Sequence, residues 1–98
     1  MDTDVINKAL PLFKVQIGQQ VREQREALEE QGIFPPGMFV SMFAMVGIAM
    51  SADDLALLES GNGPDLDARV LLALAFLFEV STDKALVGAL QEVSKQGA

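Results

Sequence analysis

Two clusters of prolines and glycines divide this 98-residue chain into short segments. The first is Pro35-Pro36-Gly37 and the second is Ser60-Gly61-Asn62-Gly63-Pro64. Consecutive prolines disfavour helix before them, and glycine-rich stretches of this kind form turns. Between the clusters, apolar residues recur every three or four positions, without the alternation typical of a strand. We therefore expect one small all-α domain, because the chain is too short for two full domains.

The spacing predicts five helices joined by short links. Pro11 lacks an amide and clashes one turn back, so we expect a kink or break near Leu10, after a turn capped by Thr3 or Asp2. The helix that follows should end at Gly32. The other helices are expected at about Pro36–Gly47, Ser51–Ser60, Pro64–Phe78, and after the caps Ser81 and Thr82.

Three of the predicted helices carry distinctive patterns. Ser51 and Asp54 form a capping box at the start of the third helix, where the helix dipole favours negative charge. In the fourth helix, Val70–Phe78 is apolar on every side, which predicts a central helix or one buried at an interface. In the fifth helix the stripe expected to face the core consists of Leu86, Leu90 and Val93.

The composition excludes most enzyme chemistry. The chain has no cysteine and no histidine, so it lacks a thiolate nucleophile, the commonest general base and the commonest metal ligand. We expect no catalytic residue, no metal and no cofactor. The apolar stretches are shorter than the roughly 20 residues that span a bilayer, and the first residues lack the basic flank of a signal peptide. We therefore expect a cytoplasmic protein that does not use a membrane.

Several short stretches carry a family resemblance when they are taken in order. One is Ile17-Gly18-Gln19-Gln20-Val21-Arg22-Glu23-Gln24-Arg25, and the next is Leu58-Glu59-Ser60-Gly61. They are followed by Pro64-Asp65-Leu66, Leu74-Ala75, Phe78-Glu79-Val80-Ser81, Asp83 and Leu86. In this order and spacing, they resemble the opening helix, the end of the recognition helix, and the last two helices of the lambda-repressor-like helix-turn-helix family, of the Cro/cI or XRE type.

The resemblance implies an organisation of the chain and one ion pair. Residues 17–98 would form a five-helix helix-turn-helix-type domain, and residues 1–16 a helical N-terminal extension. Arg25 in the first helix would form a bidentate pair with Glu59, which we interpret as structural. The connection around Glu29–Met38 is longer than is usual in the family, so its path would be remodelled.

The resemblance also implies which residues would read DNA. The small residues Ala44, Gly47 and Ala49 would suit the tight crossing of the two helices of the motif. The helix after them would be the recognition helix, whose N-terminal part enters the major groove in the family. The corresponding residues here are Ser51, Ala52, Asp53, Asp54 and Leu57.

The charge of the chain disfavours direct DNA binding. Its net charge of −7 repels a phosphate backbone, and Asp53 and Asp54 would add a local Coulomb cost. Between Val15 and Arg69, the sequence offers only Arg22 and Arg25 as basic residues. Helix N-terminal amides could still hold a phosphate, and a dimer would double that number.

We therefore expect a transcription-regulatory protein that acts through protein contacts, as a co-regulator, an anti-repressor or one subunit of a heteromer. Its partner would be another protein or a second copy, since the chain is unusually apolar for its size. The alternatives are a dimeric DNA-binding repressor or activator, and a structural all-helical oligomerisation module. On the protein-contact hypothesis, an apolar surface consists of Met38, Phe39 and Met42, with Leu57; the alternative interpretation of this row is core packing.

Overall fold

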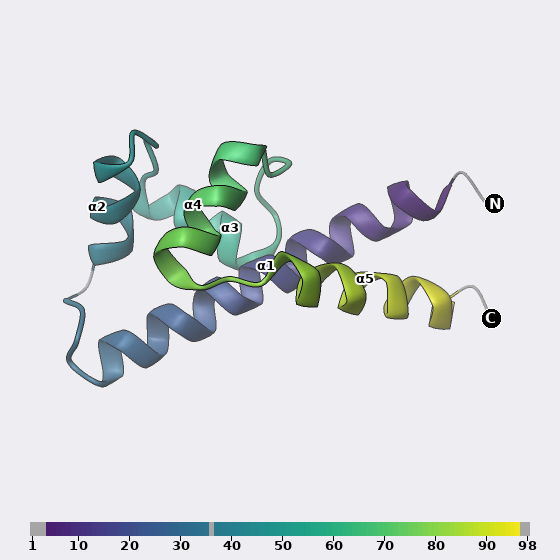
Figure 1. Ribbon diagram of the computed structural model, residues 1–98, viewed down its shortest axis with the longest axis horizontal. Helices are drawn as coiled ribbons and strands as arrows, with labels where there is room; N and C mark the ends of the chain where they lie inside the picture. The colour runs from purple at the N-terminus through teal and green to yellow at the C-terminus, as the bar shows by residue number, and fades with distance from the viewer. Residues whose placement is uncertain (1–3, 36, 97–98) are drawn as a thin grey trace.

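The computed structural model describes residues 4–35 and 37–96, which form five helices and no strand (Figure 1). The helices are α1 (Asp4–Glu30), α2 (Met38–Met45), α3 (Ala52–Ser60), α4 (Ala68–Phe78) and α5 (Thr82–Gln96). The prediction of an all-α fold with five helices is confirmed. The predicted caps Thr3 and Asp2 and the predicted helix start at Pro36 lie outside the described residues.

The first helix, α1, is a single element that passes through Pro11. Of the kink or break expected near Leu10, the break is therefore wrong. The lost amide of a proline inside a helix costs about 3 kcal/mol. We attribute the continuity to packing, because α5 lies along this part of α1 and Ala9 is buried there (Figure 1). The domain boundary expected between residues 16 and 17 falls inside this helix.

Glycine and aspartate residues set the ends of the shorter helices. Gly37 and Gly47 flank α2 at φ values of 86° and 83°, in the left-handed region that favours glycine. The start of the fourth helix is expected at Pro64, Asp65 and Asp67; the helix begins at Ala68, directly after Asp67, so Pro64 and Asp65 lie before it. Asp67 caps this helix, because its carboxylate accepts a 2.9 Å hydrogen bond from the Val70 amide.

Small residues line the contact between α5 and α1. Ala85 and Ala89 are fully buried, whereas Leu86 is 48% and Leu90 is 39% exposed. The predicted core stripe of α5 is therefore wrong at these two leucines. Small side chains allow the axes of the two helices to approach closely, and the larger apolar residues lie beside the contact.

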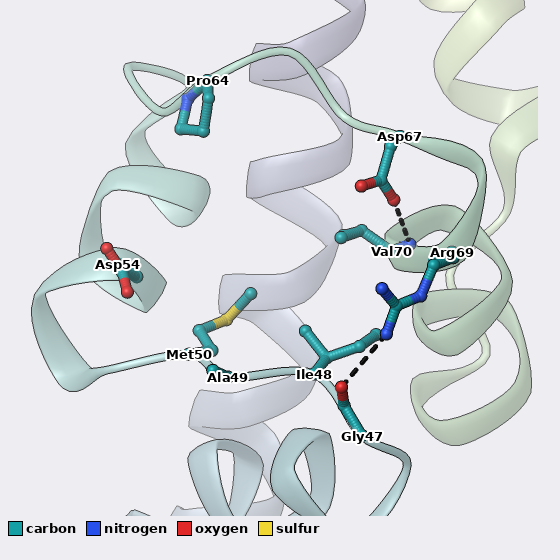
Figure 2. A pocket seen from close by; sticks show the side chains of 9 residues that line it. All are labelled: Gly47, Ile48, Ala49, Met50, Asp54, Pro64, Asp67, Arg69 and Val70. Atoms are coloured by element: carbon teal, nitrogen blue, oxygen red, sulfur yellow. Dashed lines mark hydrogen bonds between the residues drawn. The ribbon is translucent and has the colours of Figure 1, made fainter.

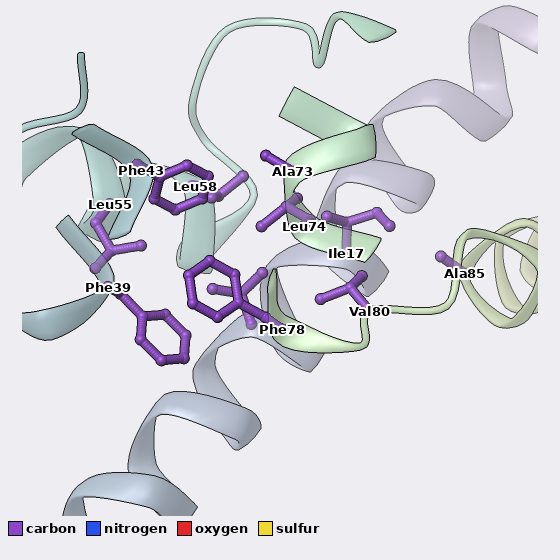
Figure 3. Packing of buried hydrophobic residues seen from close by; sticks show 11 residues of the cluster. Ile17, Phe39, Phe43, Leu55, Leu58, Ala73, Leu74, Phe78, Val80 and Ala85 are labelled. Atoms are coloured by element: carbon purple, nitrogen blue, oxygen red, sulfur yellow. The ribbon is translucent and has the colours of Figure 1, made fainter. Parts of the chain in front are cut away.

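Three phenylalanines join α2 to α4 in the centre of the core (Figure 3). The Phe39 and Phe78 rings stack at a centroid distance of 3.9 Å, and Phe43 is tilted against Phe78 at 5.3 Å. Around them lie the other buried apolar residues of the cluster. These are Ile17, Val21, Leu55, Leu58, Ala73, Leu74, Val80 and Ala85.

The crossing of α1 and α3 is closest at Gly18, which is buried. A Cβ atom at this position would lie 2.3 Å from the Leu58 carbonyl oxygen and 2.6 Å from that of Glu59. The small residues predicted to permit a tight crossing do not have this role. Ala44 and Ala49 are exposed, and a Cβ at Gly47 would meet no atom within 4 Å. The residue that permits the close approach to α3 is therefore Gly18 in α1, and the linker after α2 does not contribute to it.

The fourth helix is buried on one face and open on the other. Ala73, Leu74 and Phe78 belong to the core, whereas Leu72 is 70% and Phe76 is 82% exposed. The helix is therefore not central, and its outer face is apolar surface. None of the helices in the described part of the chain is long and apolar enough to cross a membrane.

We predict that Gly18→Ala lowers the free energy of unfolding by at least about 2 kcal/mol, as measured by urea denaturation. The added methyl group would overlap the Leu58 carbonyl, which belongs to backbone and cannot rotate away. The matched control is Gly88→Ala in α5, where the new Cβ would lie 3.1 Å from the flexible Gln16 side chain. We expect this control to change stability by less than about 1 kcal/mol. Equal losses in both variants would contradict the close crossing.

Candidate functional site

The N-terminus of α3 is the centre of the candidate interaction site. Ser51 is the N-cap residue, and its hydroxyl accepts a 3.1 Å hydrogen bond from the Asp54 amide. The Asp54 carboxylate accepts a 3.0 Å hydrogen bond from the Ser51 amide, which completes the predicted capping box. The third helix begins at Ala52 and runs to Ser60, as the sequence predicts to within one residue. This local prediction is confirmed.

The capping box leaves other groups to contact a partner. The hydrogen bond that the Asp54 carboxylate accepts from the Ser51 backbone amide, and then the favourable contact of the Ser51 hydroxyl with that carboxylate, lower the pKa of Asp54. Asp54 is therefore ionised at neutral pH and held by its own helix. Ala52 and Asp53 are exposed, and Leu57 is 44% exposed one turn further on. The five residues predicted for this face thus lie together on the outer side of α3.

An open hollow of about 510 Å³ lies beside the start of α3 (Figure 2). It is lined by the linker between α2 and α3 and by the residues that start α4. Asp54 lies on one side of the hollow and Arg69 on the other, where its guanidinium donates a 3.0 Å hydrogen bond to the Gly47 carbonyl. Asp67, Asp54 and Arg69 each have a partner within the chain. The charged side chains of the hollow are therefore held in place by hydrogen bonds within the chain.

Arg25 holds the other end of α3 to α1. Its Nε and Nη2 atoms donate hydrogen bonds of 2.6 and 2.8 Å to the two carboxylate oxygens of Glu59. Its Nη1 atom donates to Glu29 at 3.0 Å. The hydrogen bond to Glu59 raises the pKa of Arg25 further above its usual high value, against the opposing effect of burial. The predicted bidentate pair is confirmed, and its place between two helices indicates a structural role.

The apolar contact surface expected on α2 is corrected by the structure. Phe39 is 2% exposed and stacked on Phe78, so it cannot meet a partner. Met42 packs against the core, and Met38 is only partly exposed. Of the methionines in α2, Met45 is the exposed one, at 82%. The row beginning with Met38 therefore serves mainly as core packing.

The structure shows one contact between helices that the sequence did not predict, and it is made by Gln20. The side-chain amide of Gln20 donates a 2.9 Å hydrogen bond to the Ser81 carbonyl and accepts one of 2.8 Å from the Ser81 amide. Gln20 thereby fixes the junction of α4 and α5 against α1. Its position four residues after Gln16 on an amphipathic helix gives no sign of this contact, because the partner lies 61 residues away.

The basic side chains are largely occupied within the chain. Lys14, Arg22, Arg25 and Lys95 form ion pairs with carboxylates. Of these, Arg25 is the one bound to α3. In the described part of the chain, α3 carries no basic residue and its first turn carries two aspartates. The first turn of α3 is therefore acidic, and Arg69 lies across the hollow from Asp54.

Comparisons with known proteins add no relative: no family model, no curated protein and no solved structure matches this chain.

We predict that Arg25→Met lowers the free energy of unfolding by about 2 to 3 kcal/mol, since it strands the Glu59 carboxylate, whose side chain is 8% exposed. Urea denaturation measures the change. A second replacement, Glu59→Met, should recover much of the loss by removing the stranded charge. The control is Arg22→Met, which breaks an exposed pair with Glu26 and should cost less than about 0.5 kcal/mol. Equal effects of the two arginine variants would contradict the structural role of Arg25.

We predict that carboxyl NMR titration finds the Asp54 pKa below the usual aspartate value of about 3.9. A carboxylate whose pKa is depressed by folding stabilises the native state above the unfolded pKa, and this contribution is lost as the pH falls through the folded pKa. The stability difference between the wild type and Asp54→Asn should therefore be constant near neutral pH and shrink below about pH 4. A difference that grows on acidification would contradict the capping box.

Proposed function

We propose that this chain is a transcription-regulatory protein of the helix-turn-helix type that acts by binding another protein through the acidic N-terminal face of α3. On this proposal it is a co-regulator, an anti-repressor or one subunit of a heteromer. The observation that carries the proposal is the chemistry of α3. Its exposed side chains include Ala52, Asp53 and Leu57. Asp54, the other acidic residue of the first turn, is ionised at neutral pH.

These groups favour a basic, partly apolar partner. Asp53 and Asp54 present negative charge, and the positive end of the helix dipole stabilises that charge. Leu57 supplies an exposed apolar side chain on the same helix. The adjoining hollow can receive a side chain of the partner, with Asp54 at its edge. Charged rims of this kind increase the rate and specificity of association with a partner of opposite charge.

Direct DNA binding has less support than protein binding. Affinity for a phosphate backbone comes from several lysine and arginine contacts. Arg25, at the far end of α3, is bound to Glu59 and Glu29, and Arg69, across the hollow from Asp54, donates a hydrogen bond to the Gly47 carbonyl. The amides of the first turn are also partly used, since the Asp54 amide donates to Ser51. A structural oligomerisation module would account for the apolar surface, but it assigns no role to the acidic face.

We predict that NMR titrations of the backbone amides show binding of a basic peptide to α3 and no binding of a DNA duplex. A lysine- and leucine-rich amphipathic peptide should shift the amides of Ala52–Leu57. A mixed-sequence DNA duplex at moderate salt should leave them in place, because α3 offers no cation to the phosphates. Asp53→Lys should weaken binding of the peptide at least about fivefold, or about 1 kcal/mol.

The matched control is Asp83→Lys, which makes the same charge change at an exposed aspartate in the first turn of α5. This variant should retain the affinity of the wild type for the peptide. Sequence-dependent binding of DNA to the α3 amides, with a steep dependence on salt, would overturn the proposal and support a DNA-binding regulator. If Asp53→Lys and Asp83→Lys weakened peptide binding equally, the binding would depend on the net charge of the protein and not on the face of α3.

A further inference from the structure

The first part of α1 and the last part of α5 lie side by side and extend away from α2 and α4 (Figure 1). In this view the two helices run in opposite directions and form the right-hand end of the molecule. We call residues 4–10 of α1 and 86–96 of α5 the arm. The core cluster of buried residues lies at its base, where α2, α3 and α4 meet α1 (Figure 3). The arm is therefore a two-helix extension of the domain.

The arm has a small set of buried residues of its own. Ala9 is 6% exposed and Ala89 is fully buried, yet neither belongs to the cluster that forms the core of the domain. Ala85, one turn before Ala89, does belong to that cluster. The larger apolar residues Leu86 and Leu90 are exposed. Because an alanine methyl group removes far less apolar area from water than a leucine or phenylalanine side chain, the contact that closes the arm is weaker than the packing of the core.

Each helix of the arm carries a residue that weakens it near the base of the arm. Pro11 in α1 removes the helical hydrogen bond to the Asn7 carbonyl. Gly88 in α5 loses more backbone freedom on forming a helix than any other residue type would. Residues 4–10 make only about two helical turns, which is too short for a helix that is stable in water without packing. The helix before Pro11 therefore depends on its contact with α5.

The start of α5 is held to the core by contacts that do not involve the arm. The Gln20 side chain bonds to both backbone polar groups of Ser81 at 2.8 and 2.9 Å. The Ser81 hydroxyl accepts a 3.1 Å hydrogen bond from the Lys84 amide and so caps the first turn of α5. Val80 and Ala85 are buried in the core cluster. The first turn of α5 can therefore stay in place when the arm moves.

We propose that the arm is a conformational latch, in which residues 4–10 and 86–96 open and close together while the core stays folded. Opening exposes Ala9 and Ala89, and α1 then loses its helix before Pro11. The two events are coupled because α5 is the helix that packs along this part of α1. Units with few buried apolar contacts open before the whole domain unfolds. The inference does not depend on the proposed function of α3, whose binding face lies outside the arm.

Amide hydrogen exchange of the full chain, followed by NMR, tests the latch in the wild type. We expect the amides of Ala9 and Leu90 to exchange through one opening, at least about tenfold more populated than the opening that releases the Leu74 amide in the core. Equal protection of Leu90 and Leu74 would overturn the proposal, because the arm would then open only by global unfolding. Clearly different opening free energies at Ala9 and Leu90 would overturn it too, because the two halves would then open separately.

Ala89→Asp should hold the latch open, because it places a charge in the closed contact of the arm. We expect the Ala9 amide to lose its protection in this variant while the Leu74 amide keeps it. The matched control is Ala85→Asp, which makes the same change one turn earlier, at a residue of the core cluster. This control should lower the protection of Leu74 as well. Loss of protection at Leu74 by the same factor in both variants would overturn the proposal.

Adding Pro11→Ala to Ala89→Asp tests the coupling of the two halves. The alanine restores the missing helical hydrogen bond, so residues 4–10 no longer need α5 to form a helix. We expect the Ala9 amide to regain protection relative to Ala89→Asp alone, while the Leu90 amide stays unprotected. Protection that returns at both positions, or at neither, would contradict a latch that breaks α1 at Pro11.

Discussion

The close crossing of α1 and α3 is the constraint on which the rest of the fold depends. At Gly18 the backbones of the two helices approach so closely that no side chain fits between them. Two turns further along α1, Arg25 binds both carboxylate oxygens of Glu59. A steric contact and a bidentate ion pair therefore fix both the distance and the rotation of α3. Its N-terminal face is presented outward by a helix that is held from behind.

The features that could be predicted from the sequence depend on neighbouring residues. The capping box needs only Ser51 and Asp54, three positions apart, and the five helices follow from apolar spacing and from the positions of glycine and proline. The Arg25–Glu59 pair spans 34 residues and was expected only through the family resemblance. Local rules therefore predicted the elements and the start of the candidate site.

The features that could not be predicted depend on how the helices are placed against one another. The spacing of Phe39 is compatible with the core and with a contact surface, and the stacked Phe78 ring decides between them. Leu86 and Leu90 form a regular apolar stripe, yet the closeness of α5 to α1 favours Ala85 and Ala89 at the contact. Likewise Phe76 is as apolar as Phe78, and its exposure follows from the side of α4 on which it lies. In each case the spacing is compatible with either orientation.

The bond between Gln20 and Ser81 has a consequence for how this chain acquires its structure. It joins positions 61 residues apart, and α5 packs along α1 beyond it. Contacts between such distant segments require closure of a long loop, which slows folding relative to bundles built from adjacent helices. During synthesis, α1 has no α5 to cover it until nearly all of the described chain has been made. The part of α1 that α5 covers therefore stays uncovered until α5 has been made, which makes the nascent chain more exposed to aggregation than the native protein.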